Sequence, residues 1–123
     1  MNLASYIDHT VLKSDTTQDM VRTLCAEARE YGFASVCVNS CHTRLVAEAL
    51  AGSDVLTCVV VGFPLGAMST AAKVFKTQQA VRDGAQEIDM VINVGAIKDG
   101  RWEFVQDDIY AVVEAARPAK VKV

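Results

Sequence analysis

The sequence predicts an α/β protein built around a parallel sheet, and three observations support that fold class. Short β-branched apolar runs alternate four times with segments of helical periodicity along the 123 residues. The run at 55–63 is almost wholly apolar, which is typical of a strand covered on both faces. A fifth run begins at residue 120. Because strands that alternate with helices pair in parallel, we expect four βα units plus the start of strand five.

The first βα unit shows how each element is derived. Its strand is expected at 6–12, and Ser14 to Thr17 then offer side chains of the kind that cap helix N-termini. Gly32 is expected to end the helix, since glycine readily adopts the left-handed conformation of a C-terminal cap. Apolar residues between these ends have the i, i+3, i+4, i+7 spacing of one helix face, and they are Val21, Leu24, Cys25 and Ala28.

The later units repeat this alternation. Strands are expected at 33–39, 55–63, 87–94 and from 120 onward, and helices at about 43–50 and 69–82. The last helix ends before Pro118 and carries an apolar stripe of Trp102, Val105, Ile109, Val112, Val113 and Ala116. Gly62 and Gly66 are expected to form a flexible turn; no Lys-Ser/Thr follows them, so it is not a nucleotide-binding loop.

Length and composition limit the classes of function. The length allows one domain, residues 1–123. A formal net charge of −3 and a pI near 5.3 argue against a general nucleic-acid surface. No stretch approaches the roughly 20 apolar residues of a membrane span, and we expect no secretory signal. The four cysteines are therefore expected to be reduced thiols in a cytoplasmic protein.

Polar side chains from several expected strands are predicted to meet on one face of the sheet. Side chains alternate along a strand, so Asp89 shares its face with Glu87, while Ile88 and Met90 point the other way, against helices. The same alternation gives an inward set of Asp8, Thr10, Asn39, Asp89, Asn93 and Lys122. A carboxylate near a lysine suits carbon-acid chemistry, in which the lysine forms an imine and the carboxylate moves protons.

Simpler interpretations of the polar residues remain open at this stage. Each of them, taken alone, fits a strand end in water. Cys37, Cys41 and His42 suggest a zinc site, but a fourth ligand is missing. His9 shares a face with apolar residues and is expected to be a hydrogen-bonded, partly buried side chain. The acidic pair at 107–108 is expected on the solvated face of the last helix.

Two other α/β classes fit the length and the strand count. A receiver-type signalling domain matches Asp8 and Lys122 loosely, but it needs a phosphoacceptor aspartate at the end of the third strand. Residues 60–63 (Val-Val-Gly-Phe) contain none. A flavodoxin-like flavin binder needs a phosphate loop rich in Ser, Thr and Gly after the first strand, and residues 10–13 (Thr-Val-Leu-Lys) do not form one.

Four segments, in order along the whole chain, resemble the deoxyribose-phosphate aldolase family. They are YIDHTVLK at 6–13, FASVCVN at 33–39, VGFPLG at 61–66 and EIDMVINVG at 87–95. The resemblance implies a class I aldolase on a (β/α)8 barrel. Such an enzyme cleaves 2-deoxyribose 5-phosphate to acetaldehyde and glyceraldehyde 3-phosphate through a lysine Schiff base, without a metal or other cofactor.

The resemblance also implies roles for individual residues. By position, Asp89 resembles the catalytic proton-relay aspartate on the fourth strand, Asp8 and Thr10 line the substrate pocket, and Cys37 lies beside it. Lys122 resembles the lysine on the family's fifth strand, which is not the Schiff-base residue. We expect Cys37, Asn39 and Lys122 to contact substrate as well. The family's Schiff-base lysine, its helper lysine and its phosphate-binding loops belong to strands six to eight, beyond residue 123.

These observations together predict the N-terminal half of a (β/α)8 TIM barrel. A complete barrel takes about 250 residues, and the sequence stops inside an expected strand. We expect a truncated domain that is inactive alone and that forms a homo-oligomer through its open edges at 6–12 and 120–123. Val59 and Val61 are expected on its inner face. The alternative is a non-catalytic, self-associating α/β scaffold.

Overall fold

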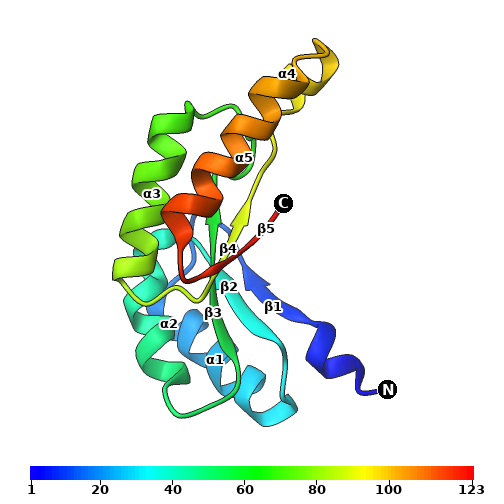
Figure 1. Ribbon diagram of the computed structural model, residues 1–123. Helices are drawn as coiled ribbons and strands as arrows, with labels where there is room; N and C mark the ends of the chain where they lie inside the picture. Colours follow the sequence, from blue (N-terminus) through cyan, green and yellow to red (C-terminus); the bar gives the residue numbers. More distant parts are fainter.

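A computed structural model describes all 123 residues and shows a parallel sheet of five strands in the order β1-β2-β3-β4-β5 (Figure 1). The strands are β1 (Asp8–Val11), β2 (Ser35–Val38), β3 (Leu56–Val61), β4 (Glu87–Met90) and β5 (Lys120–Lys122). The main helices are α1 (Gln18–Tyr31), α2 (Thr43–Leu50), α3 (Thr70–Arg82) and α5 (Trp102–Ala116). They lie along one face of the sheet and leave the other face open (Figure 1). The predicted α/β class, with four βα units and the start of a fifth strand, is confirmed.

Local signals set most element boundaries as expected, with three short additions. Thr17 caps α1 by accepting a hydrogen bond from the Met20 amide at 3.2 Å, and Gly32 ends it with a φ of 69°. The additions are η1 (Leu3–Tyr6), η2 (Ser40–His42) and α4 (Val94–Lys98). The strand expected at 6–12 therefore begins later, because Tyr6 belongs to η1. No helix is long and apolar enough to span a membrane.

The strand expected at 87–94 ends at Met90, and this changes the role of Asn93. The Asn93 side-chain oxygen accepts a hydrogen bond from the Ala96 amide at 3.0 Å and so caps the N-terminus of α4. Its placement among the inward-facing strand residues was therefore wrong. The cause is the usual preference of asparagine for helix N-caps, which here outweighs continuation of the strand.

Two apolar clusters hold the helices on the sheet. The first lies between α1, α2, β2 and the residue before β3, and contains Val21, Cys25, Ala28, Val36, Val38, Val46, Leu50 and Val55. The second lies under α3 and α5 and contains Val59, Val61, Ala80, Ala85, Ile88, Met90, Val112 and Ala116. As predicted, Ile88 and Met90 therefore face the helices.

The expected inward placement of Val59 and Val61 is wrong, because both belong to the helix-facing cluster. Cys58 and Val60 point to the concave face instead, where they pack with Cys37. The register explains this, since Cys37 pairs with Cys58 and paired residues in a parallel ladder present the same face. The strand is apolar on both faces, so its own pattern does not distinguish them.

A buried ion pair joins α3 to α5. It shows that the prediction of a solvent-exposed Asp108 was wrong. Lys73 Nζ lies 2.6 Å from Asp108 Oδ2, and their side chains are 0% and 1% exposed. Thr70 donates to the other Asp108 oxygen at 2.7 Å, and Lys73 also donates to the Val91 carbonyl at 3.2 Å. Asp108 lies on the buried face of α5, whereas Asp107 is exposed as predicted.

The turn at 62–66 is tightly packed rather than flexible. Gly66 has a φ of 67°, and a Cβ on it would lie 2.1 Å from the Ile92 carbonyl oxygen. The Gly66 amide also donates to the Gly62 carbonyl at 2.7 Å. Only glycine allows the loop after β3 to approach the chain after β4 this closely. The loop therefore fixes the carboxyl ends of β3 and β4 relative to each other.

Candidate active site

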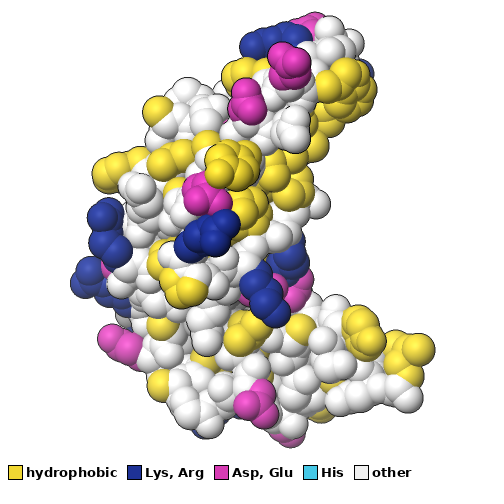
Figure 2. Space-filling model, viewed as in Figure 1, with side chains coloured by type: hydrophobic (Ala, Val, Ile, Leu, Met, Phe, Trp, Pro, Cys, Tyr) yellow, Lys and Arg dark blue, Asp and Glu magenta, His cyan; other side chains and the backbone are white.

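The concave face of the sheet carries an ion pair that joins its two edge strands. Lys122 Nζ on β5 lies 2.5 Å from Asp8 Oδ2 on β1, although β1 and β5 are at opposite edges. The two residues are 114 positions apart in sequence, so curvature of the sheet brings them into contact. The concave face forms a hollow, which Figure 2 shows as an indentation in a crescent-shaped outline, with basic and acidic side chains together inside it.

Asp8 is held by two hydrogen-bond donors. Ser35 Oγ on β2 donates to Asp8 Oδ1 at 2.6 Å, and Lys122 donates to the other oxygen. Partial burial acts to raise the pKa of Asp8, but the hydrogen bonds from Lys122 and Ser35 outweigh burial, so the pKa lies below its ordinary value. The Asp8 carboxylate is therefore ionised at neutral pH.

Lys122 keeps its proton in this setting. Partial burial acts to lower the pKa of Lys122, but the hydrogen bond to Asp8 and the charges of its neighbours outweigh burial and raise the pKa. Glu87 Oε2 contributes from 3.9 Å away. Because an amine must lose its proton to attack a carbonyl, Lys122 is suited to be a fixed positive charge rather than a nucleophile.

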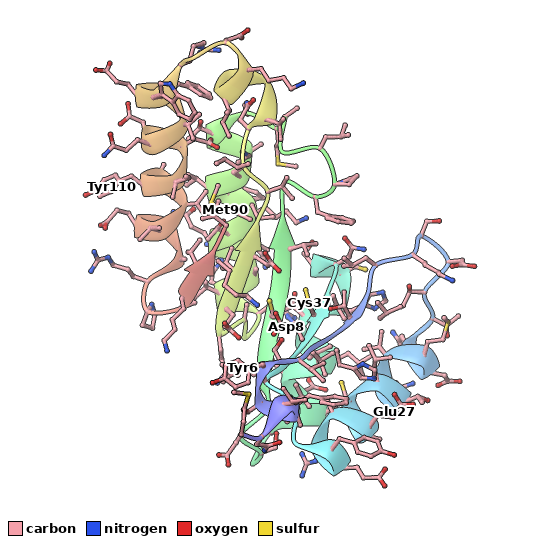
Figure 3. The ribbon with its side chains drawn as sticks, turned by 90° about the vertical axis from the view of Figure 1, so that its right-hand side faces the viewer. Tyr6, Asp8, Glu27, Cys37, Met90 and Tyr110 are labelled. Carbon is pink, nitrogen blue, oxygen red and sulfur yellow. The ribbon has the colours of Figure 1, made fainter.

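Asp89 and two cysteines lie beside this ion pair. Asp89 is half-buried on β4 and is the register partner of Lys122. A carboxylate oxygen of Asp89 and the Sγ atoms of Cys37 and Cys58 all lie within 4.8 Å of one another. Figure 3 looks onto this face and shows Cys37 close to Asp8 near its centre. Four predicted site residues, Asp8, Cys37, Asp89 and Lys122, are thus brought together.

The two buried thiols affect each other. The neighbouring Cys58 thiol lowers the pKa of Cys37, whereas Cys37 and burial both raise the pKa of Cys58. Both thiols are free, with Cys37 2% and Cys58 0% exposed. Cys37 therefore has the greater thiolate character of the two.

Thr10 and Asn39, also predicted as substrate-binding residues, make different contacts. Thr10 is exposed, and its hydroxyl donates to the Asp8 backbone carbonyl at 2.8 Å. Asn39 follows β2, where its side-chain amide donates to the Leu12 carbonyl at 3.4 Å. This bond links the carboxyl ends of β1 and β2. The substrate contacts of Thr10 and Asn39 stay predictions.

The zinc set suggested by sequence spacing does not assemble. Cys41 is exposed on η2, and neither Cys41 nor His42 belongs to a cluster of three metal-ligating groups. His9 lies on the helix side of β1, where Nε2 is 2.6 Å from Glu27 Oε2 and the ring centroid is 5.0 Å from that of Phe33. The prediction of a partly buried, hydrogen-bonded His9 is confirmed.

Sequence reasoning did not include Ser35 or Cys58 among the site residues. Alternation along β2 carries a signal for Ser35, since it places this residue on the same face as Cys37. Cys58 has no such signal within its own apolar strand. Only its pairing with Cys37 across the β2–β3 ladder places it on the concave face.

Comparison with known proteins connects this face to one family. The model of the DeoC/LacD family aldolases matches residues 2–123. The chain belongs to this family. Among the DeoC/LacD aldolases, the deoxyribose-phosphate aldolases of Clostridium novyi and Staphylococcus epidermidis are 58% and 56% identical to it over its full length. The resemblance inferred from the four sequence segments is therefore confirmed.

Solved aldolase structures share the fold over nearly the whole chain. A crystal structure from Coccidioides immitis, provisionally assigned as a deoxyribose-phosphate aldolase, matches with a TM-score of 0.96, 41% identity and 99% coverage of this chain. The tetrameric deoxyribose phosphate aldolase of Aeropyrum pernix matches 97% of this chain with a TM-score of 0.80 and 29% identity. The match covers 48% and 51% of those two chains and 56% of each of the two bacterial relatives. The chain thus spans about half the length of the aldolases it matches, consistent with the N-terminal half of a TIM barrel.

Proposed function

We propose that this chain supplies the proton-transfer side of an aldolase site that cleaves 2-deoxyribose 5-phosphate into acetaldehyde and glyceraldehyde 3-phosphate. The observation that carries the proposal is the register of β4 and β5, which places Asp89 opposite Lys122 on the concave face of an aldolase-family sheet. Lys122 is held there by its ion pair with Asp8. Membership of the family supports the choice of reaction, and the deoxyribose-phosphate aldolases among its relatives support the choice of substrate.

Asp89 is the proposed proton carrier. Retro-aldol cleavage requires a base that takes the proton of the β-hydroxyl group as the carbon–carbon bond breaks, and then a donor that protonates the carbon left behind. A half-buried carboxylate on a central strand reaches the hollow while its backbone stays fixed in the sheet. Asp89 is therefore suited to move this proton, directly or through a water molecule.

Lys122 is proposed to act by charge. Its ammonium group is fixed by Asp8, and its backbone is in register with Asp89. A fixed cation beside the proton carrier stabilises negative charge that develops during cleavage. The raised pKa of Lys122 opposes imine formation, so we assign the Schiff-base lysine to the part of the family's barrel outside residues 1–123. A polypeptide of these 123 residues alone is then expected to be inactive.

Borohydride trapping tests this division of roles. The 123-residue chain and a chimera that joins it to the remainder of the Clostridium novyi aldolase are incubated with acetaldehyde and sodium borohydride, and adducts are located by mass spectrometry. We expect no adduct at Lys122 in either protein, and one adduct in the added half of the chimera. Stoichiometric labelling of Lys122 would contradict the proposal. A Lys122→Arg chimera, which cannot form an imine at this position, is the control.

We also infer that the chain self-associates through its edge strands. β1 and β5 each pair with a neighbour on one side only, so each has an outer edge of backbone groups available to another strand. Sedimentation equilibrium at micromolar concentration is expected to show a dimer or larger species. A single 13.3 kDa monomer with a cooperative thermal transition would contradict this inference.

A further inference from the structure

Three metal-ligating groups converge on the concave face. The Sγ atoms of Cys37 and Cys58 and a carboxylate oxygen of Asp89 lie within 4.8 Å of one another. They come from three neighbouring strands, since Cys37 and Cys58 are register partners on β2 and β3 and Asp89 lies on β4. No other group of three His, Cys, Asp or Glu side chains is so arranged in this structure. A regular sheet, rather than a mobile loop, therefore presents the cluster.

We propose that Cys37, Cys58 and Asp89 form a binding site for a thiophilic divalent cation such as Zn²⁺, with a fourth coordination position open to the hollow. Ligand atoms around a tetrahedral zinc ion are about 3.5–3.8 Å apart, given Zn–S and Zn–O distances of about 2.3 and 2.1 Å. Atoms within 4.8 Å of one another reach that spacing through shifts of about 1 Å or less. Two sulfur ligands favour zinc over Mg²⁺ or Ca²⁺, which prefer oxygen.

The charge balance of the face also suits such an ion. Binding converts two thiols to thiolates and releases two protons to solvent, while the metal contributes two positive charges. The net charge of the face is therefore unchanged by binding, and Lys122 stays beside the site as a cation.

A bound ion would compete with proton transfer. Asp89 is the proposed proton carrier, and a carboxylate that coordinates a metal is not free to accept a proton. The cation is therefore an inhibitor of the aldolase site rather than its cofactor. This consequence rests on the proposed function, but the binding site does not, and binding is measured below without any assay of activity.

Titration with Co²⁺ tests the site in the 123-residue chain. The reduced, metal-free protein is titrated while thiolate-to-cobalt charge-transfer absorption is recorded, and Zn²⁺ is then added to displace the cobalt. We expect one equivalent of Co²⁺ with absorption from two thiolates, and release of two protons to an indicator dye. The Cys58→Ser variant is expected to lose about half of the absorption per bound cobalt and to bind more than about 100-fold more weakly.

Matched variants separate this site from other thiols and carboxylates. Cys41→Ser removes the exposed thiol, and Glu87→Gln changes a carboxylate on the same strand and face as Asp89; both are expected to bind as the parent does. Asp89→Asn is expected to weaken metal binding at least about tenfold. Asp89 is only half-buried, so the variant is expected to fold, and circular dichroism checks this. No charge-transfer absorption, absorption lost with Cys41→Ser, or unchanged affinity in Asp89→Asn would each overturn the proposal.

Discussion

The buried ion pair between α3 and α5 makes a strong prediction about stability. Asp108→Asn keeps the shape of the side chain and an oxygen for its hydrogen bond with Thr70, but it leaves Lys73 without a counter-charge. Lys73 is 0% exposed and its Nζ lies 2.6 Å from Asp108. Removing one partner of such a pair costs about 3–5 kcal/mol of unfolding free energy. The neighbouring exposed residue gives the matched control, since Asp107→Asn should cost less than about 0.5 kcal/mol.

Urea unfolding followed by circular dichroism measures the difference. For a urea dependence of about 1–3 kcal/mol per molar, a loss of 3–5 kcal/mol lowers the midpoint by at least about 1 M, or unfolds the variant in buffer. Adding Lys73→Met to Asp108→Asn removes the unpaired charge and is expected to restore part of the lost stability. Equal midpoints for the Asp107 and Asp108 variants would refute the buried pair, as would a double variant less stable than Asp108→Asn.

Three further predictions concern the sheet and its loops. Ile88→Asn should lower the unfolding free energy by at least about 3 kcal/mol, because it buries an unpaired amide, whereas Asp89→Asn should change it little. Equal decreases in melting temperature for the two variants would show that the two faces of β4 are misassigned. The folded-state pKa of Asp8 is lowered, so its contribution to stability is present above its unfolded pKa near 3.8 and is lost as pH falls through the folded value. The stability difference between the parent and Asp8→Asn should therefore shrink below pH 3.8 in acid denaturation, and a difference that grows there would be inconsistent with the ion pair. Gly66→Ala should destabilise the protein more than Gly32→Ala. Both glycines have a left-handed backbone, but only at residue 66 would the added Cβ clash with a carbonyl oxygen. Equal melting temperatures for the two variants would argue against the tight loop.

The sequence pattern predicted which face of β4 each side chain occupies, because polar and apolar residues alternate along this strand. Ile88 and Asp89 have opposite chemistry, so each indicates its own environment. The same reasoning failed on β3, where Val59 and Val60 are equally apolar. The register of β3 with β2 and β4 determines which of its side chains lie on the concave face, and the sequence of β3 alone does not specify that register.

The buried position of Asp108 was missed for a related reason. Its charge suggested a solvated helix face, yet it lies three residues after Val105 and four before Val112, both of which are buried. The helical spacing thus carried a signal that the residue type concealed. A partner that neutralises the charge, Lys73, lies 35 residues away on another helix, and the sequence does not specify that contact.

The candidate site was predictable as a face but not as a set of contacts. Alternation placed Asp8 and Lys122 on one side of the sheet. Their hydrogen bond depends on the curvature of five strands and joins residues 114 positions apart, so neither strand predicts it alone. Asn93 shows the opposite case, because a local helix cap removed it from the inward-facing strand residues.

The rate of 2-deoxyribose 5-phosphate cleavage by the Clostridium novyi chimera tests the central claim most directly. Acetaldehyde release is measured for the chimera and for its Asp89→Asn and Glu87→Gln variants, with the 123-residue chain measured beside them. If Asp89 carries the proton, Asp89→Asn lowers kcat by about 100-fold or more, Glu87→Gln retains most of the activity, and the isolated chain has none. An Asp89→Asn chimera that cleaves as fast as its parent, with the same imine adduct under borohydride, would contradict the claim.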